Sequence, residues 1–223
     1  MGRIMTPLTT TAAPVLSRVT PGVSLAVLGQ ALFLAGAWML PVVTGTDAVR
    51  DRISDLVLGP YGYVQTAAYL ISGLGLVALA GLLRAQLTPG PSRSPGVMLI
   101  TLAGIGAILS GVLQPVASSG SGDLWSLLSI GSIHATLNLA SSIAMLLGML
   151  VLTWAFSFDP EWDVLTLASA FLSGAALTFI VVQSGVPVVG LLQRCQATVV
   201  GIWVILVAFN TLRMASPYRR RNI

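Results

Sequence analysis

Long apolar runs dominate the chain and leave too little charge to cover a water-facing surface. Of the 223 residues, 55% are hydrophobic and only 8% are charged, and the mean hydropathy is +0.90. A soluble domain carries roughly 25% charged residues. A surface that faces hydrocarbon needs almost none, because lipid is its solvent. The composition therefore predicts an integral membrane protein without a soluble domain of its own.

The apolar runs have the length of transmembrane helices, since about 20 residues cross the hydrocarbon core. We predict an all-α polytopic membrane protein, a bundle of six transmembrane helices with short loops. The segment 88–95 is predicted to be a loop, because prolines lack an N–H donor and clash with the preceding turn. The predicted spans are approximately 22–43, 61–83, 97–116, 133–156, 164–184 and 197–212.

The arginines predict the orientation of the bundle. All eleven basic residues are arginine, and with the N-terminus inside, eight lie on the inner side and three on the outer side. Basic residues concentrate in cytoplasmic loops. We therefore expect a multi-pass membrane protein with both termini in the cytoplasm. Its parts would be a flexible segment, 1–20, the transmembrane domain, 21–215, and a basic tail, 216–223.

Composition also narrows the classes of cofactor and partner. The net charge of +4 comes from arginines beside apolar spans, which are topology signals, so we expect no nucleic-acid partner. The single cysteine, Cys195, cannot form a disulfide within the chain. The single histidine, His134, excludes a haem held by two histidines of this chain. No short metal-binding signature such as His-Glu-x-x-His is present, and we expect neither a metal nor a cofactor.

The predicted topology gathers polar residues at the outer face. They come from the first loop, the end of the third span, the start of the fourth, and the segment before the sixth. Asp51, Asp55 and His134 are the candidates for acid/base catalysis. The candidates for binding are Ser54, Gln114, Asn138 and Arg194.

The first loop has the pattern of a short interfacial helix. Val49, Ile53 and Leu56 recur at helical spacing, and aspartates at 47, 51 and 55 would then form one acidic stripe. Like charges four residues apart repel each other, so we expect Arg50, Arg52 or Arg194 to offset them. A solvated face with surface ion pairs is the alternative.

His134 and Asn138 share one face of the fourth span, because they lie four residues apart. An ionisable residue at the edge of a span suggests a functional site, and the alternative is an interfacial histidine bonded to a neighbouring loop. No acidic residue lies inside a predicted span, which argues against an ion-coupled transporter. Gln30 and Asn210 are the deeper polar residues.

Several short motifs resemble a known family. They are Arg52-Ile-Ser-Asp-Leu56 followed by Gly59-Pro60, His134 at the start of the fourth span, and Gly190-Leu-Leu-Gln-Arg194 before a final span with Trp203. Together they resemble the bacterial membrane proteins grouped as domain of unknown function 998, over roughly residues 22–212. The resemblance implies a six-helix bundle in the bacterial plasma (inner) membrane, and it nominates Ser54, Asp55, His134 and Arg194. Pro115 departs from it, because no acidic residue follows before Asp123. The family supplies no activity that could be transferred.

Three functions remain open on the sequence. The first, which we favour, is a binding or accessory protein that works with membrane lipids and with a protein partner or further copies of itself. The second is an enzyme of the outer leaflet acting on a lipid or lipid-linked group, with Arg194 as an anion clamp. The third is a small uniporter or lipid-translocating protein.

Overall fold

The computed structural model describes residues 13–113, 130–183 and 186–215, and these residues form helices and connections without strands. Six of the helices are long and apolar enough to cross a membrane, which confirms the predicted all-α six-helix bundle. A short 3-10 helix, η1, follows the first of them. The elements are α1 (Ala13–Thr44), η1 (Ile53–Leu58), α2 (Gly62–Gln86), α3 (Arg93–Val112), α5 (Ile130–Phe156), α6 (Asp163–Val182) and α7 (Val189–Ala215).

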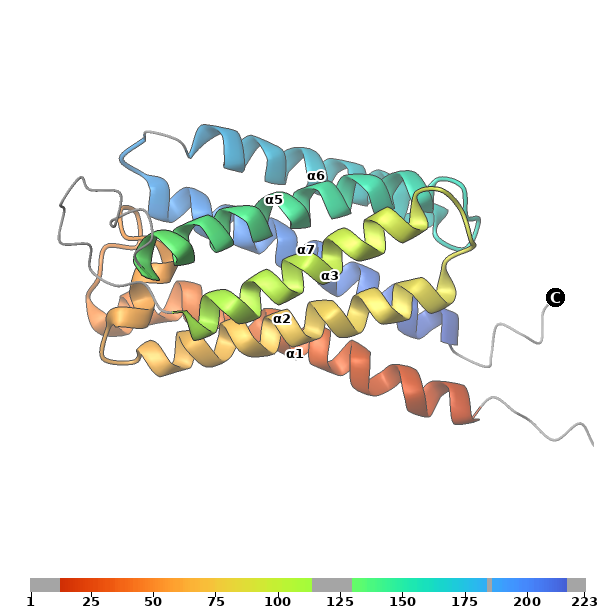
Figure 1. Ribbon diagram of the computed structural model, residues 1–223, viewed down its shortest axis with the longest axis horizontal. Coiled ribbons are helices and arrows are strands. Elements are labelled where there is room, and N and C mark those ends of the chain that lie inside the picture. The colour runs from red at the N-terminus through yellow and green to blue at the C-terminus, as the bar shows by residue number, and fades with distance from the viewer. Residues whose placement is uncertain (1–12, 114–129, 184–185, 216–223) are drawn as a thin grey trace, which may run out of the picture.

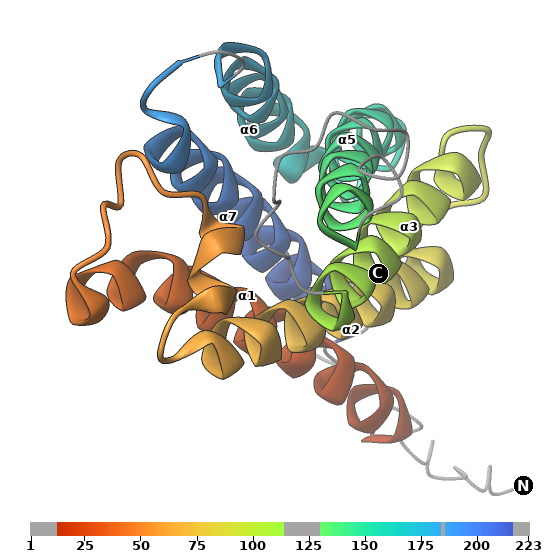
Figure 2. The same ribbon diagram turned by 60° about the vertical axis from the view of Figure 1, so that its left-hand side comes forward.

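The long helices form a circuit (Figures 1 and 2). Each packs against the next along the chain, and α7 returns to pack against α1. The described chain begins and ends at one end of the bundle, which we call the terminal end (Figure 1). The opposite end, the cap end, carries residues 45–61, the cap, together with the starts of α5 and α7.

The helices α3 and α7 begin earlier than the sequence predicts. The expectation of a loop through Pro95 is wrong, because α3 starts at Arg93. Proline is tolerated in a first turn, where its missing N–H would have no helical acceptor. The last span starts at Val189 rather than at residue 197, so Arg194 lies within α7. Polar residues interrupt the apolar run there, and two of them, Gln193 and Arg194, hydrogen-bond the cap.

The remaining helix bounds lie close to the predicted spans, except at the N-terminus. α1 starts at Ala13 and runs through Pro21, where the sequence suggested an entry point. Residues 1–12 of the predicted N-terminal segment and the predicted tail, 216–223, lie outside the described residues.

Apolar packing fills the half of the bundle toward the terminal end. The Phe156 ring stacks on Trp162 at 5.1 Å, and the Trp203 indole donates to the Ser169 hydroxyl at 2.6 Å. Burial of such side chains contributes about 25 cal/mol per Å² where they leave water. The largest fully buried apolar side chains here are Leu79, Leu83, Ile100, Met149, Leu152, Phe156, Trp162, Trp203, Val204 and Val207.

Glycines allow a close helix approach between α2 and α3. A Cβ on Gly104 would lie 2.7 Å from the Gly73 carbonyl oxygen, and a Cβ on Gly73 would lie 2.6 Å from that of Gly104. Small residues allow such backbone contact between membrane helices. Gly104 and Gly111 of α3 thus both pack against α2.

We expect Gly104→Ala to lower the thermal unfolding midpoint in detergent, because two helix backbones must separate at a cost of about 1–3 kcal/mol. Gly174→Ala is the matched control, since a Cβ on that helical glycine meets nothing within 4 Å. Equal midpoints for the two variants would contradict the close α2–α3 contact.

Candidate functional site

The aspartates of the cap bind its own backbone. The Asp47 carboxylate accepts the Val49 N–H at 2.9 Å, and the Asp51 carboxylate accepts the Asp47 N–H at 2.9 Å. The Asp55 carboxylate accepts the Arg52 N–H at 3.0 Å. Short acidic side chains commonly stabilise turns in this way. Each carboxylate therefore fixes one turn of the cap.

This arrangement corrects the predicted interfacial helix. Residues 48–51 form turns, and a 3-10 helix begins only at Ile53, so the aspartates do not lie on one helical stripe. The backbone bonds of the carboxylates hold the chain in turns where an α-helix would need those N–H groups. Part of the expected charge compensation is present: Arg50 and Asp47 form an exposed ion pair at 3.8 Å, and Asp47, Asp51 and Asp55 interact electrostatically with Arg194.

η1 anchors the cap on the bundle through apolar contacts. Ile53 and Leu56 are buried against Ala37 and Leu40 of α1. At the entrance of α2, a Cβ on Gly62 would collide with the Val57 carbonyl oxygen, so the backbones touch there. The cap therefore lies directly on the ends of α1 and α2.

Arg194 of α7 is the buried centre of the cap end. Its side chain is 0% exposed, although its charge would be strongly solvated in water. Its Nη1 donates to the carbonyl oxygens of Ala48 and Asp51, both at 2.8 Å, and of Gly190 at 3.0 Å. Its Nε donates to the Ala37 carbonyl oxygen at 2.8 Å. One guanidinium thus ties together α1, the cap and α7.

The contact with Ala37 has a cause in the sequence of α1. Pro41 lies four residues after Ala37 inside the helix, and it has no N–H to donate to the Ala37 carbonyl. That carbonyl would be an unpaired acceptor in a buried position. Arg194 Nε takes the place of the missing backbone donor. Pro41 thus leaves the Ala37 carbonyl without a helical donor, and Arg194, distant in the sequence, supplies the donor.

The start of α7 contributes three further contacts to the cap. A Cβ on Gly190 would collide with the Asp51 carbonyl oxygen, so only glycine lets the cap backbone pass there. The Leu191 N–H donates to the Val49 carbonyl oxygen at 3.0 Å. The Gln193 side-chain oxygen accepts the Ile53 N–H at 3.1 Å, at the start of η1. The sequence Gly190–Arg194 is therefore a docking segment for the cap.

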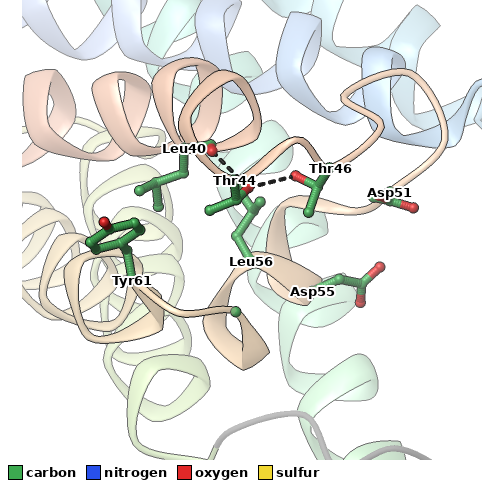
Figure 3. Close-up of a pocket in the computed structure, with 8 residues that line it drawn as sticks. Leu40, Thr44, Thr46, Asp51, Asp55, Leu56 and Tyr61 are labelled. Atoms are coloured by element: carbon green, nitrogen blue, oxygen red, sulfur yellow. Dashed lines mark hydrogen bonds between the residues drawn. The ribbon is translucent and has the colours of Figure 1, made fainter.

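A shallow hollow of about 50 Å³ lies beside the cap (Figure 3). Leu40, Leu56 and Tyr61 supply its apolar lining, and the carboxylates of Asp51 and Asp55 lie at its edge. Its volume suits one or two water molecules rather than a lipid group, since a water occupies about 30 Å³ in the liquid.

The other predicted site residues have different partners. His134 is 3% exposed, and its Nδ1 lies 2.7 Å from the Leu113 carbonyl oxygen at the end of α3. Asn138 is half-buried and hydrogen-bonds Tyr69 of α2. Ser54 is buried within η1. Gln114 lies outside the described residues.

The structure thus divides the predicted site into two groups. Asp51 and Asp55 lie in the cap, and Arg194 of α7 hydrogen-bonds the backbone carbonyl of Asp51 rather than its carboxylate. His134 and Asn138 bind α3 and α2. Among the described residues, no group of three or more histidine, cysteine, aspartate or glutamate side chains could hold a metal ion.

Sequence reasoning missed Pro41, Gln65 and Ser110. Pro41 was detectable as a proline inside an apolar span, which leaves a carbonyl without a donor. Gln65 and Ser110 are both 0% exposed, and they stand out only as polar residues in apolar runs. Their importance depends on which helices they face, and the sequence does not specify that.

The fold and the buried cap contacts define a polytopic helical membrane protein closed at one end by a short loop and 3-10 helix. The family described as "Protein of unknown function (DUF998)" matches residues 27–210, and the chain belongs to this family. No curated protein and no solved structure gives a significant match.

We expect Gly190→Ala to detach the cap from α7, because the new methyl group would occupy the position of the Asp51 carbonyl oxygen. The variant should unfold at lower temperature than the parent, and protease should cleave residues 45–61 faster. Gly174→Ala serves as control for an alanine placed in open space. Unchanged cleavage of the cap would refute the docking role of Gly190.

Proposed function

We propose that the chain is a multi-pass bacterial plasma-membrane protein that serves as a binding or accessory protein, with the cap facing outward. The arginine distribution supports this orientation, because Arg84, Arg93 and Arg213 lie toward the terminal end. The apolar exterior is solvated by membrane lipids. The cap supplies a fixed outer surface for a protein partner or a second copy of the chain.

The observation that carries this proposal is the set of hydrogen bonds of Arg194. Its Nε and Nη1 donate to four carbonyl oxygens, and the cap aspartates accept backbone N–H groups. A guanidinium used in this way positions a loop, and only its buried Nη2 is left without a partner among the described residues. The polar cluster is therefore best explained as the fastening of a rigid cap.

The enzyme alternative has weaker support. An acid/base pair must reach one substrate, whereas Asp55 binds the cap backbone and His134 binds the end of α3. The carrier alternative also lacks support, because apolar side chains fill the described interior toward the terminal end. Gln30, the deep polar residue of α1, donates to Ser72 at 2.7 Å.

The proposal predicts a graded loss of stability in Arg194 variants. Arg194→Gln should remove most of the four contacts and lower the unfolding free energy by about 3 kcal/mol or more, since hydrogen bonds to buried charged groups each contribute about 1.5–3 kcal/mol. Arg194→Lys should be nearly as damaging, because an ammonium cannot reproduce the planar fork. Thermal unfolding in detergent measures both.

Arg50→Gln is the control, since the Arg50 side chain is 77% exposed and its ion pair contributes about 0–1 kcal/mol. Asp55→Asn should have a small effect, because the amide oxygen still accepts the Arg52 N–H. Unchanged melting of Arg194→Gln would refute the fastening role and restore Arg194 as a ligand-binding residue.

Orientation is tested separately with reporters. An alkaline phosphatase fused after residue 215 should be inactive, and one inserted in the cap should be active, because this enzyme needs the disulfide-forming environment outside the cytoplasm. The reverse result would place the cap in the cytoplasm.

A further inference from the structure

The outward face of α7 is an apolar stripe that ends in a cation. Ile202, Leu206 and Phe209 are 43%, 38% and 55% exposed. Arg213 is exposed in the last turn of the helix. These four residues, which we call the α7 stripe, share one face because they recur at helical spacing. The opposite face of α7, with Trp203, is buried in the bundle.

The α7 stripe has the length of one membrane leaflet. Ile202 is the middle residue of α7, and Arg213 lies toward the terminal end (Figure 1). The distance along the helix between them is about 16 Å at about 1.5 Å per residue. Half of the hydrocarbon core is about 15 Å thick. The arginine therefore lies at headgroup depth when the three apolar side chains lie among acyl chains.

More arginines follow Arg213 in the sequence. Arg219, Arg220 and Arg221 come soon after it, and no aspartate or glutamate lies between residues 164 and 223. Within the described ranges, Arg213 forms no ion pair with an acidic side chain. The end of α7 and the sequence after it thus carry positive charge that no acidic residue of this segment offsets.

The end of α2 lies beside the end of α7 and adds to this charge. Gln86 Nε2 donates to the Thr211 carbonyl oxygen at 3.1 Å, so the two helix ends meet. Arg84, in the last turn of α2, is exposed. Arg93 has a different task, because its Nη1 donates to the Leu87 carbonyl oxygen at 3.2 Å just after α2.

The acidic residues of the terminal end belong to the turn between α5 and α6. Asp159 is 6% exposed, and its carboxylate accepts the Thr88 N–H at 3.0 Å and the Thr88 hydroxyl at 2.9 Å. Asp163 is exposed, but it starts α6. The ends of α2 and α7 therefore form the basic side of this end of the bundle.

We propose that the α7 stripe binds an anionic phospholipid of the leaflet at the terminal end. An acyl chain lies along Ile202, Leu206 and Phe209, and the Arg213 guanidinium donates to the phosphate oxygens. A guanidinium matches phosphate geometry with two parallel N–H donors. Arg84 and the arginines at 219–221 strengthen binding through their charge. The site is remote from the cap and does not depend on the proposed accessory role or orientation.

The charges favour an anionic lipid over a zwitterionic one. The ammonium group of a zwitterionic headgroup would need a carboxylate, and the segment after α6 begins has none beyond Asp163. An anionic headgroup such as that of phosphatidylglycerol carries no cation that the arginines would repel. Clusters of arginines directly after a membrane helix commonly attract anionic lipids.

Native mass spectrometry of the full chain in detergent tests the proposal, because it measures binding of single added phospholipids. Phosphatidylglycerol should bind about tenfold or more tightly than phosphatidylcholine with the same acyl chains. Arg213→Gln should weaken phosphatidylglycerol binding about fivefold, which is the contribution of one arginine near an anionic surface. Changing residues 219–221 to Gln should weaken it further. Insertion orientation cannot affect this measurement, since a detergent micelle has no inner and outer side.

Arg50→Gln is the matched control, because it removes the same charge from an exposed position in the cap. It should leave phosphatidylglycerol binding unchanged. Equal binding of the two lipids by the unmodified protein would overturn the proposal. So would an Arg213→Gln variant that binds as well as Arg50→Gln.

A headgroup without chains tests the apolar part of the stripe. Glycerol phosphate carries the anionic group but has no acyl chain to lie along α7. It should therefore fail to displace bound phosphatidylglycerol. Displacement by glycerol phosphate would show an anion site that does not recognise a lipid, and it would overturn the assignment.

Discussion

The buried guanidinium of Arg194 is the interaction on which the cap end depends. A charge in an apolar interior is tolerated only when hydrogen bonds replace its hydration. Here the replacements are carbonyl oxygens of α1, the cap and α7. Because the charge must be satisfied, the three segments that supply the carbonyls are held in fixed positions. Burying the arginine therefore fixes the positions of α1, the cap and α7 relative to one another.

The two halves of the bundle are held by different forces. Toward the terminal end, close-packed apolar side chains and stacked aromatic rings predominate. Lipid is as apolar as these side chains, so van der Waals packing rather than expulsion of water holds the helices there. Toward the cap end, directional hydrogen bonds fix the backbone. In this half, Gln65, Ser110 and His134 each carry a buried polar atom without a partner among the described residues.

The Gly190–Arg194 motif was detectable in the sequence, but its contacts were not. Its sequence suggested an extramembrane segment with a basic residue, yet it forms the first turns of α7. Gly190 leaves room for the cap backbone, and Gln193 accepts the N–H at the start of η1. Arg194 donates to the Ala37 carbonyl, which Pro41 cannot reach with an N–H. None of these partners is near in the sequence. The polar residues made the motif visible in the sequence, but only the tertiary contacts show that it holds the cap.

The sequence by itself determined the membrane location, the six helices and the family, because apolar runs and short motifs are local properties of the chain. It also nominated Arg194 and His134. Tertiary structure decided that the cap aspartates bind backbone N–H groups, that Arg194 contacts carbonyls, and that His134 contacts the Leu113 carbonyl at the end of α3. The physical reason is that hydrogen-bond partners of a buried group are set by helix packing. Spacing along one helix predicts a shared face, but it does not predict which other helix that face meets.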